Sequence, residues 1–289
     1  MICTLCPRQC GALRTETEGK GFCGMPAQPV VARAMLHQWE EPCISGPRGS
    51  GAVFFSGCVL GCVFCQNGSI SRERFGKTVS AARLREIFED LIAQGAHNIN
   101  LVSPTPYVPA ILEALAEPLP VPVVWNTGGY ERVETLRMLE GKAQIWLPDL
   151  KYADNALAKA YSGAADYFET AAAAIREMHR QAGDYVLEDG LLRRGVVIRH
   201  LLLPGALDNA KAVMDWVANT FRPGQVLFSL MAQYTPQPGA EGPLARRVRG
   251  GEYRAAAAYM ENLGITDGYC QDLSSARREY TPAFDLQGV

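Results

Sequence analysis

The sequence predicts an α/β protein whose parallel sheet forms an open barrel, and three observations lead to this prediction. From Gly51 onward, short β-rich runs alternate with helical patterns, as they do in sheets built from β-α-β units. There are six such repeats, too few for a closed eight-stranded barrel. The chain has 289 residues, of which 48% are hydrophobic and 20% charged, so it is long and apolar enough to bury a full core.

The predicted elements follow one another without long gaps. Apolar β-rich runs predict strands over 51–57, 97–102, 121–126, 144–149, 194–203 and 226–232. Helical spacing predicts helices over 80–94, 107–116, 131–140, 165–182 and 207–219, with Ser80, Thr105 and Asp208 near helix starts. A last helix is expected over 250–263, before an irregular tail over 264–289. We therefore expect three parts, namely a cysteine-rich segment (1–45), the barrel (46–240), and a C-terminal helix with its tail (241–289).

Cys58, Cys62 and Cys65 follow the first predicted strand in a C-x3-C-x2-C loop. Iron–sulfur cubanes are normally held by four cysteines, so three thiolates leave one iron open to a ligand that is not protein. A structural zinc or disulfide cluster is the alternative, but structural zinc sites favour two separated pairs of ligands. The loop also lies just past the C-terminal end of a strand, where barrel enzymes place their active sites. The context therefore favours a catalytic iron–sulfur cluster.

A second group of cysteines lies near the N-terminus, in the spacing C-x2-C-x3-C-x12-C. Four thiolates make a closed site for either zinc or a second cubane, and we favour iron–sulfur. The members of this group are Cys3, Cys6, Cys10 and Cys23. Cys43 and Cys270 have no assigned role, and a lone cysteine is most often a small buried hydrophobe.

The overall charge and the N-terminal sequence exclude several classes of function. A net charge of −2 and a pI of about 6.1 supply no general field for a polyanion, so nucleic-acid binding is not indicated. No stretch approaches the roughly 20 apolar residues of a membrane-spanning helix, and the N-terminus carries cysteines where a signal peptide needs a basic and then an apolar region. We predict a cytoplasmic protein, in which reduced thiols favour metal binding over disulfides.

The three-cysteine loop, with Phe64 just before its last cysteine, resembles the cluster-binding loop of the radical S-adenosylmethionine (SAM) superfamily. The resemblance implies a partial (β/α)6 barrel and a 4Fe-4S cluster whose fourth iron is chelated by the amino and carboxylate groups of SAM. It also implies the chemistry of that family. An electron from the reduced cluster cleaves the sulfonium to methionine and a 5′-deoxyadenosyl radical, which takes a hydrogen atom from the substrate.

Polar residues after the next two strands resemble motifs of the pyruvate formate-lyase activating enzymes. Ser103 and Thr105 stand where those enzymes usually carry a Gly-Gly-Glu turn that receives the SAM amino group. The resemblance implies that these hydroxyls, or the Ser103 carbonyl, accept instead of a carboxylate, while an ordinary proline-rich turn is the alternative. Asn126, Thr127 and Gly128 are similar to the Asn-Gly-type turn of the same enzymes, where glycine lets the chain approach a ligand.

The later strands carry three further matches. Asp149-Leu150-Lys151 matches the Asp-Leu-Lys of those enzymes, which implies Lys151 near the SAM carboxylate or ribose and Asp149 near the hydroxyls or the substrate. The alternative is a buried structural ion pair. Arg199 lies in a strand similar to their Arg-x-x-x-Pro-Gly strand and is the implied partner of the carboxylate or ribose, since its fork pairs bidentately with carboxylates. Gln233 stands where relatives have polar residues on the substrate side, or it packs at the barrel mouth.

The resemblance implies a radical SAM enzyme that abstracts a hydrogen atom, with a backbone glycine of a glycyl-radical enzyme as the favoured substrate. Radical modification of another peptide, protein or small molecule is the first alternative. A non-enzymatic iron–sulfur carrier or a zinc-ribbon interaction module is the alternative from another class. The resemblance further implies an electron donor such as flavodoxin or ferredoxin.

Overall fold

The computed structural model describes residues 2–271, 273–275 and 281–289. Its strands are β1 (Val30–His37), β2 (Ser50–Phe55), β3 (Lys77–Thr78), β4 (Ile99–Val102), β5 (Val123–Thr127), β6 (Ile145–Pro148), β7 (Val186–Glu188), β8 (Leu191–Leu201), β9 (Leu227–Met231) and β10 (Gly268–Cys270). Its α-helices are α1 (Pro42–Ser45), α2 (Gly68–Ser71), α3 (Ala81–Ala93), α4 (Val108–Ala114), α5 (Val133–Arg137), α6 (Asn155–Ser162), α7 (Tyr167–Ala182), α8 (Leu207–Thr220) and α9 (Gly250–Asn262).

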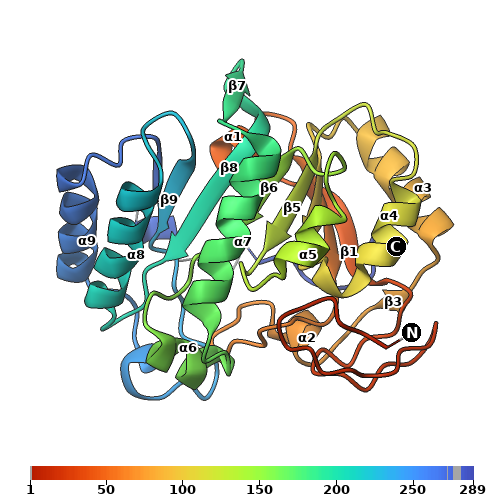
Figure 1. Cartoon of the computed structure of the whole chain (residues 1–289), viewed down its shortest axis with the longest axis horizontal. Coiled ribbons are helices and arrows are strands. Elements are labelled where there is room, and N and C mark those ends of the chain that lie inside the picture. Colours follow the sequence, from red (N-terminus) through yellow and green to blue (C-terminus); the bar gives the residue numbers. More distant parts are fainter. Residues whose placement is uncertain (1, 272, 276–280) are drawn as a thin grey trace.

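The strands form one sheet in the order β10-β9-β8-β6-β5-β4-β2-β1-β3, with β7 paired to β8 (Figure 1). Strands β2, β4, β5, β6, β8, β9 and β10 are parallel to their neighbours in this series. The described edges of the sheet, β3 and β10, do not pair with each other. The prediction of an open parallel barrel with six β-α repeats is therefore confirmed.

Four strands of the sheet, namely β1, β3, β7 and β10, were not among those predicted. β1 runs antiparallel to β2 and falls inside the stretch 1–45, which the sequence analysis treated as a cysteine-rich segment. β10 falls inside the tail over 264–289 and pairs in parallel with β9. β10 has only three residues, too few for a period of two to be recognised in a sequence.

The interior of the barrel is apolar at the amino ends of the strands. There, α1 fills the barrel, and its residues Cys43 and Ile44 are buried against inward-facing side chains. The partners of this plug are Val124, Ile145, Leu147, Leu192, Val197 and Leu227. Since strand residues alternate between the two faces, Asn126, Asp149 and Arg199 follow on the same inner face, one step nearer the carboxyl ends. The plug thus fills the interior of the barrel at the amino ends of the strands, and the polar cavity inside the barrel lies at their carboxyl ends.

The last described residues return to β1. The Leu286 amide donates to the Ala32 carbonyl at 3.0 Å, and the Ala34 amide donates to the Gln287 carbonyl at 2.9 Å. Phe284 packs against Phe54 of β2, with ring centroids 5.5 Å apart. The tail therefore covers part of the edge of β1. None of the described helices is both long and apolar enough to cross a lipid bilayer.

Candidate active site at the carboxyl ends of the strands

One cavity of about 200 Å³ opens at the carboxyl ends of the strands. It is lined by all three cysteines of the loop after β2 and by nearly every other predicted site residue of the barrel. These are Cys58, Cys62, Phe64, Cys65, Ser103, Asn126, Thr127, Gly128, Asp149, Lys151, Arg199 and Gln233. The fold thus brings together residues from six separate segments that the sequence placed only at the ends of successive strands.

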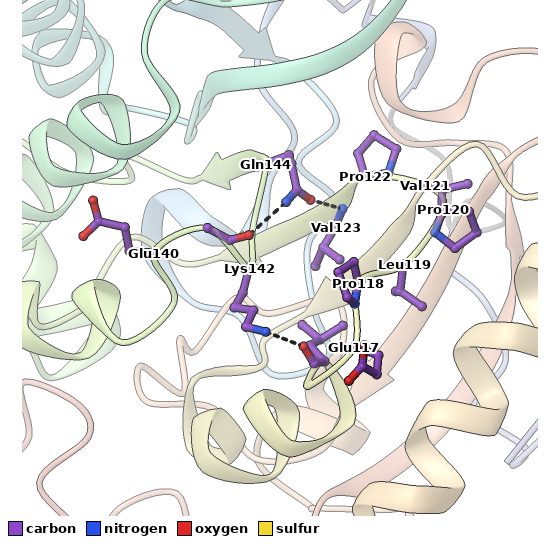
Figure 2. Close-up of a pocket in the computed structure, with 12 residues that line it drawn as sticks. Glu117, Pro118, Leu119, Pro120, Val121, Pro122, Val123, Glu140, Lys142 and Gln144 are labelled. Atoms are coloured by element: carbon purple, nitrogen blue, oxygen red, sulfur yellow. Dashed lines mark hydrogen bonds between the residues drawn. The ribbon is translucent and has the colours of Figure 1, made fainter.

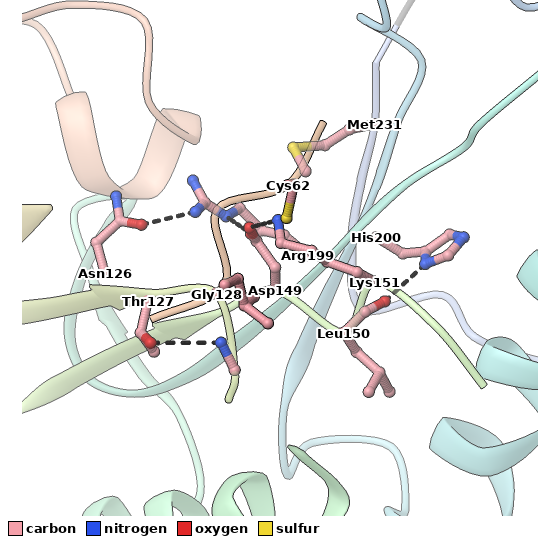
Figure 3. A network of polar contacts seen from close by, with 12 residues as sticks. Cys62, Asn126, Thr127, Gly128, Asp149, Leu150, Lys151, Arg199, His200 and Met231 are labelled. Atoms are coloured by element: carbon pink, nitrogen blue, oxygen red, sulfur yellow. Dashed lines mark hydrogen bonds and ion pairs between the residues drawn. The ribbon is translucent and has the colours of Figure 1, made fainter. Parts of the chain in front are cut away.

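The centre of the cavity is a network of ion pairs and hydrogen bonds around Arg199 (Figure 3). Its guanidinium donates from Nε to Asp149 Oδ1 at 2.9 Å and from Nη2 to Asn126 Oδ1 at 2.7 Å. Its third nitrogen donates to Glu40 Oε2 at 3.0 Å. Lys151 Nζ contacts the other oxygen of Asp149. Each of the three guanidinium nitrogens of Arg199 therefore donates to a side chain of the protein, which uses three of its five N–H donors.

These contacts keep the central groups charged despite their burial. Burial alone raises the pKa of Asp149, but Arg199 and Lys151 outweigh this effect and hold that pKa below its ordinary value. Burial likewise lowers the pKa of Lys151, but the Asp149 carboxylate outweighs burial and raises it. The Asp149 carboxylate and the cations of Lys151 and Arg199 therefore form a fixed, ionised cluster in the cavity.

Glu40 and Glu41 belong to the same cluster, and the sequence analysis did not find them. Glu40 lines the cavity, and its Oε1 accepts a hydrogen bond from Asn126 Nδ2 at 3.1 Å. Glu41 is 4% exposed, and burial raises its pKa although Arg199 and Ser229 act in the opposite direction. Both residues come from the turn between β1 and the plug helix α1. No local pattern signalled them, because only the path of β1 brings this turn into the barrel.

A buried carboxylate, Glu131, lies beside the predicted Ser103–Thr105 turn. The hydroxyls of Thr105 and Thr127 both donate to Glu131 Oε1, each at 2.5 Å. Burial raises the pKa of Glu131 from 4.5 to about 7, and its Oε2 has no hydrogen-bond partner among the described residues. Thr105 itself is 2% exposed and lies behind the cavity lining. The turn therefore offers Ser103 to the cavity, and the end of β5 offers Thr127, which Glu131 holds from behind.

The thiols of the three-cysteine loop are largely shielded from water. Burial raises the pKa of Cys62 to about 12 and also raises the pKa of Cys58. Ser162 Oγ donates to Cys62 Sγ at 2.9 Å. Within the described ranges, no three His, Cys, Asp or Glu side chains converge closely enough to hold a metal ion. Three thiols on one cavity wall nevertheless suit a cluster with one open iron, and binding it must release their protons.

The N-terminal cysteines form a compact unit of their own beside this loop. Its chain reversals are fixed by two hydrogen bonds, from the Gln9 amide to the Cys6 carbonyl at 3.0 Å and from the Gly24 amide to the Gly21 carbonyl at 2.9 Å. Burial, with the charges of neighbouring thiols, raises the pKa of Cys6 to about 12 and raises that of Cys23. Cys10 is exposed, and backbone amides outweigh its slight burial and lower its pKa.

A larger cavity, of about 460 Å³, lies at the opposite end of the sheet (Figure 2). Its walls are the proline-rich stretch 115–123, which leads into β5, and residues 140–144, which lead into β6. Lys142 Nζ is tied to the Leu115 carbonyl at 2.7 Å, and no cysteine lines the cavity. The smaller cavity is therefore the candidate active site, because of these two cavities it is the one lined by both thiols and a charged network.

Comparison with known protein families decides what this site belongs to. The family model of the "Radical SAM superfamily" matches residues 52–217, which is more than half of the chain. The chain belongs to the radical SAM superfamily. The superfamily implies an enzyme that uses a 4Fe-4S cluster and SAM, and the match covers the cysteine loop and most of the barrel strands of this radical SAM protein.

Individual proteins are similar to this chain in sequence or in fold. The radical SAM protein is 30% identical over 245 residues to the uncharacterized protein MJ0674 of Methanocaldococcus jannaschii, over 81% of this chain and 66% of that one. Its fold is similar to that of SuiB from Streptococcus suis, with a TM-score of 0.53 and 13% identity over 76% of this chain and 49% of SuiB. A radical SAM methyltransferase from Sphaerobacter thermophilus matches with a TM-score of 0.51 and 17% identity, over 77% of this chain and 66% of that one. The chain thus spans just under two thirds of MJ0674 and about half of SuiB.

Proposed function

We propose that this radical SAM protein cleaves SAM reductively and abstracts a hydrogen atom from a backbone glycine of a partner, as an activase of a glycyl-radical enzyme. The observation that carries the proposal is the single cavity shared by Cys58, Cys62 and Cys65 and the polar cluster around Arg199. These three cysteines would hold the 4Fe-4S cluster, which supplies the electron for SAM cleavage when it is bound and reduced. The similarity of Asp149, Lys151 and Arg199 to the motifs of pyruvate formate-lyase activating enzymes supports the choice of substrate.

The contacts in the cavity suggest how its residues divide the work. The guanidinium of Arg199 is occupied by three side chains, whereas Lys151 Nζ has Asp149 as its one hydrogen-bond partner among the described residues. Lys151 is therefore the cation with fewer side-chain partners to rearrange and is the proposed donor to the SAM carboxylate, while Arg199 holds Asp149 and Asn126 in place. Thr127 donates its proton to Glu131 and accepts a hydrogen bond from the Gly129 amide at 3.3 Å, so one acceptor position of its oxygen is left for the SAM ammonium group.

The N-terminal cysteines are best explained by a second metal centre. Cys3, Cys6, Cys10 and Cys23 lie in one small unit whose thiols perturb one another's pKa. We propose that they hold either a second 4Fe-4S cluster or zinc, and iron and zinc counts on the purified protein distinguish the two. An electron donor such as flavodoxin or ferredoxin completes the proposed system.

The test of the proposed function begins with anaerobic reconstitution using iron and sulfide. Dithionite and SAM are then added, and 5′-deoxyadenosine is measured by chromatography for the wild type and for Cys58→Ala/Cys62→Ala/Cys65→Ala. We expect deoxyadenosine from the wild type alone, and absence of product despite a complete cluster would reject SAM cleavage. A second stage adds a recombinant glycyl-radical enzyme and records the electron paramagnetic resonance (EPR) spectrum. A glycyl radical supports the activase role, while deoxyadenosine without that radical favours another peptide, protein or small molecule as substrate.

A further inference from the structure

One arginine joins the N-terminal cysteine unit to the catalytic loop. Arg8 lies between Cys6 and Cys10, and its guanidinium reaches across to two other segments of the chain. Nε donates to the Val59 carbonyl at 2.8 Å, and Nη2 lies 3.4 Å from the Leu60 carbonyl. These two carbonyls belong to the stretch between Cys58 and Cys62. Arg8 therefore binds the backbone of the catalytic loop.

The same guanidinium also holds the end of α6. Nη2 donates to the Ser162 carbonyl at 2.7 Å, and Nη1 donates to the Gly163 carbonyl. These carbonyls belong to the last helical residue and the left-handed C-cap, where a helix exposes acceptors that favour a cation. Arg8 is thus a bridge between the catalytic loop and the C-terminal end of this helix.

Aromatic rings on two sides keep Arg8 in this position. Its guanidinium carbon lies 4.0 Å from the centroid of Phe22, in the N-terminal unit, and 5.3 Å from the centroid of Tyr130, in the barrel. A planar guanidinium combines such ring contacts with several hydrogen bonds in one geometry, which a lysine ammonium cannot do. Contacts from four segments of the chain therefore specify arginine at this position.

The held helix end carries a side chain that donates to a loop thiol. Ser162 Oγ donates to Cys62 Sγ at 2.9 Å and lies 2.8 Å from the hydroxyl of Tyr152. Ser162 is 4% exposed, so its hydroxyl has little competing water. A hydrogen bond to a ligating sulfur stabilises the reduced cluster, because the added electron places more negative charge on the sulfurs. The distance between Ser162 and Cys62 therefore bears on the reduction potential.

We propose that Arg8 is a positioning residue for the radical cluster, which locks the Cys58–Cys62 stretch to the end of α6 and so preserves the Ser162–Cys62 hydrogen bond. This inference rests on the proposed function in one respect, since it takes Cys62 as a cluster ligand. It assigns the N-terminal cysteine unit a mechanical role, which is to present Arg8 to the catalytic loop.

The test compares Arg8→Ala and Arg8→Lys with a matched control, Arg132→Ala. Arg132 also bridges the barrel and the N-terminal unit, donating to the Thr4 carbonyl at 2.7 Å, but its hydrogen bonds and ion pairs with described residues do not involve the catalytic loop. The first readout is hydrogen exchange of the metal-free chain. We expect faster exchange at the amides of 59–63 in both Arg8 variants, and unchanged exchange there in Arg132→Ala. This readout holds even if the chain forms no cluster, so it separates failure of the inference from failure of the proposed function.

The second readout is the midpoint potential and EPR spectrum of the reconstituted cluster. Ser162→Ala should shift the midpoint to a more negative value, and Arg8→Ala should shift it in the same direction. Because both substitutions act on one hydrogen bond, the double variant should show a shift smaller than the sum of the two. A midpoint in Arg8→Ala equal to that of Arg132→Ala, or fully additive shifts, would overturn the proposal.

Discussion

Cys62 in the three-cysteine loop and Cys10 in the N-terminal unit are the same side chain in opposite surroundings. Cys62 is 6% exposed, lines the cavity and accepts a hydrogen bond from Ser162, whereas Cys10 is exposed at the surface. Burial raises the pKa of Cys62 to about 12, while backbone amides lower that of Cys10. The comparison teaches that thiol count alone does not separate a catalytic from a structural centre. The polar groups that lie beside the thiols distinguish the two kinds of centre.

The largest expected effect separates the two groups outright. Cys58→Ala/Cys62→Ala/Cys65→Ala should abolish formation of 5′-deoxyadenosine, because three thiolates are the protein's whole contribution to an open cluster. The N-terminal centre should survive, with about four irons per chain if it is a cubane. Chromatography of deoxyadenosine and iron analysis on the same sample measure both. Retained deoxyadenosine formation would show that the loop is not the catalytic centre.

The next effect tests the charged surroundings of the loop. Asp149→Asn leaves Arg199 and Lys151 without their shared carboxylate, and removing one partner of a buried pair costs about 3–5 kcal/mol. We expect that loss in the free energy of unfolding by denaturant titration, together with weaker SAM binding. As a matched control, Asp285→Asn removes a half-exposed partner of Arg33 at the surface and should cost at most ~1 kcal/mol. Equal losses in the two variants would show that burial adds nothing to this pair.

Glu131 lies near both the cavity and the N-terminal unit, and its protonation makes the stability of the folded chain depend on pH. Its pKa is about 7 in the folded chain and near 4.5 when unfolded, so the folded state binds the proton more tightly. This contribution to stability is complete below pH 4.5 and is lost as the pH rises through 7. The loss amounts to roughly 3 kcal/mol, at 1.36 kcal/mol per pKa unit. Glu131→Gln should therefore gain stability relative to the wild type as the pH rises from 5 to 8, in denaturant titrations at both values.

The N-terminal group should show a smaller and different response. Cys6→Ser/Cys23→Ser removes ligands from both halves of the unit and should eliminate its metal, lowering the melting temperature by about 2–4 °C for each kcal/mol lost. Deoxyadenosine formation should fall without disappearing, because Cys58, Cys62 and Cys65 remain. Metal analysis and calorimetry measure the two effects. A metal content equal to that of the wild type would contradict the proposed second centre.

The smallest effect concerns a cysteine outside both groups. Cys270 lies exposed in β10, and the cavity lining does not include it. Cys270→Ala should leave deoxyadenosine formation and substrate turnover unchanged, within the error of the chromatographic assay. Reduced turnover in this variant would instead make Cys270 a hydrogen donor.

The sequence by itself determined six parallel strands of the sheet, the three-cysteine loop and the polar residues at the strand ends. These predictions depend on local signals, namely a period of two in strands, a spacing of three or four residues between thiols, and the rule that parallel strands end at one edge. Ser80 shows the same principle at a helix start, since its side chain accepts from the Arg83 amide as predicted. Such signals lie within a few residues of one another, so folding is not needed to read them.

Only the tertiary structure decided which charges meet in the cavity and what holds the loop. Glu40 reaches Arg199 across 159 positions, and Ser162 reaches Cys62 across 100. Arg8 reaches Gly163 across 155 positions. A single acid, serine or arginine has no periodicity, and its partner is set by where β1, α6 and the N-terminal unit pack. The residues of the site could therefore be predicted from their order in the sequence. The contacts that hold them in place could not, because they depend on packing between segments far apart in the chain.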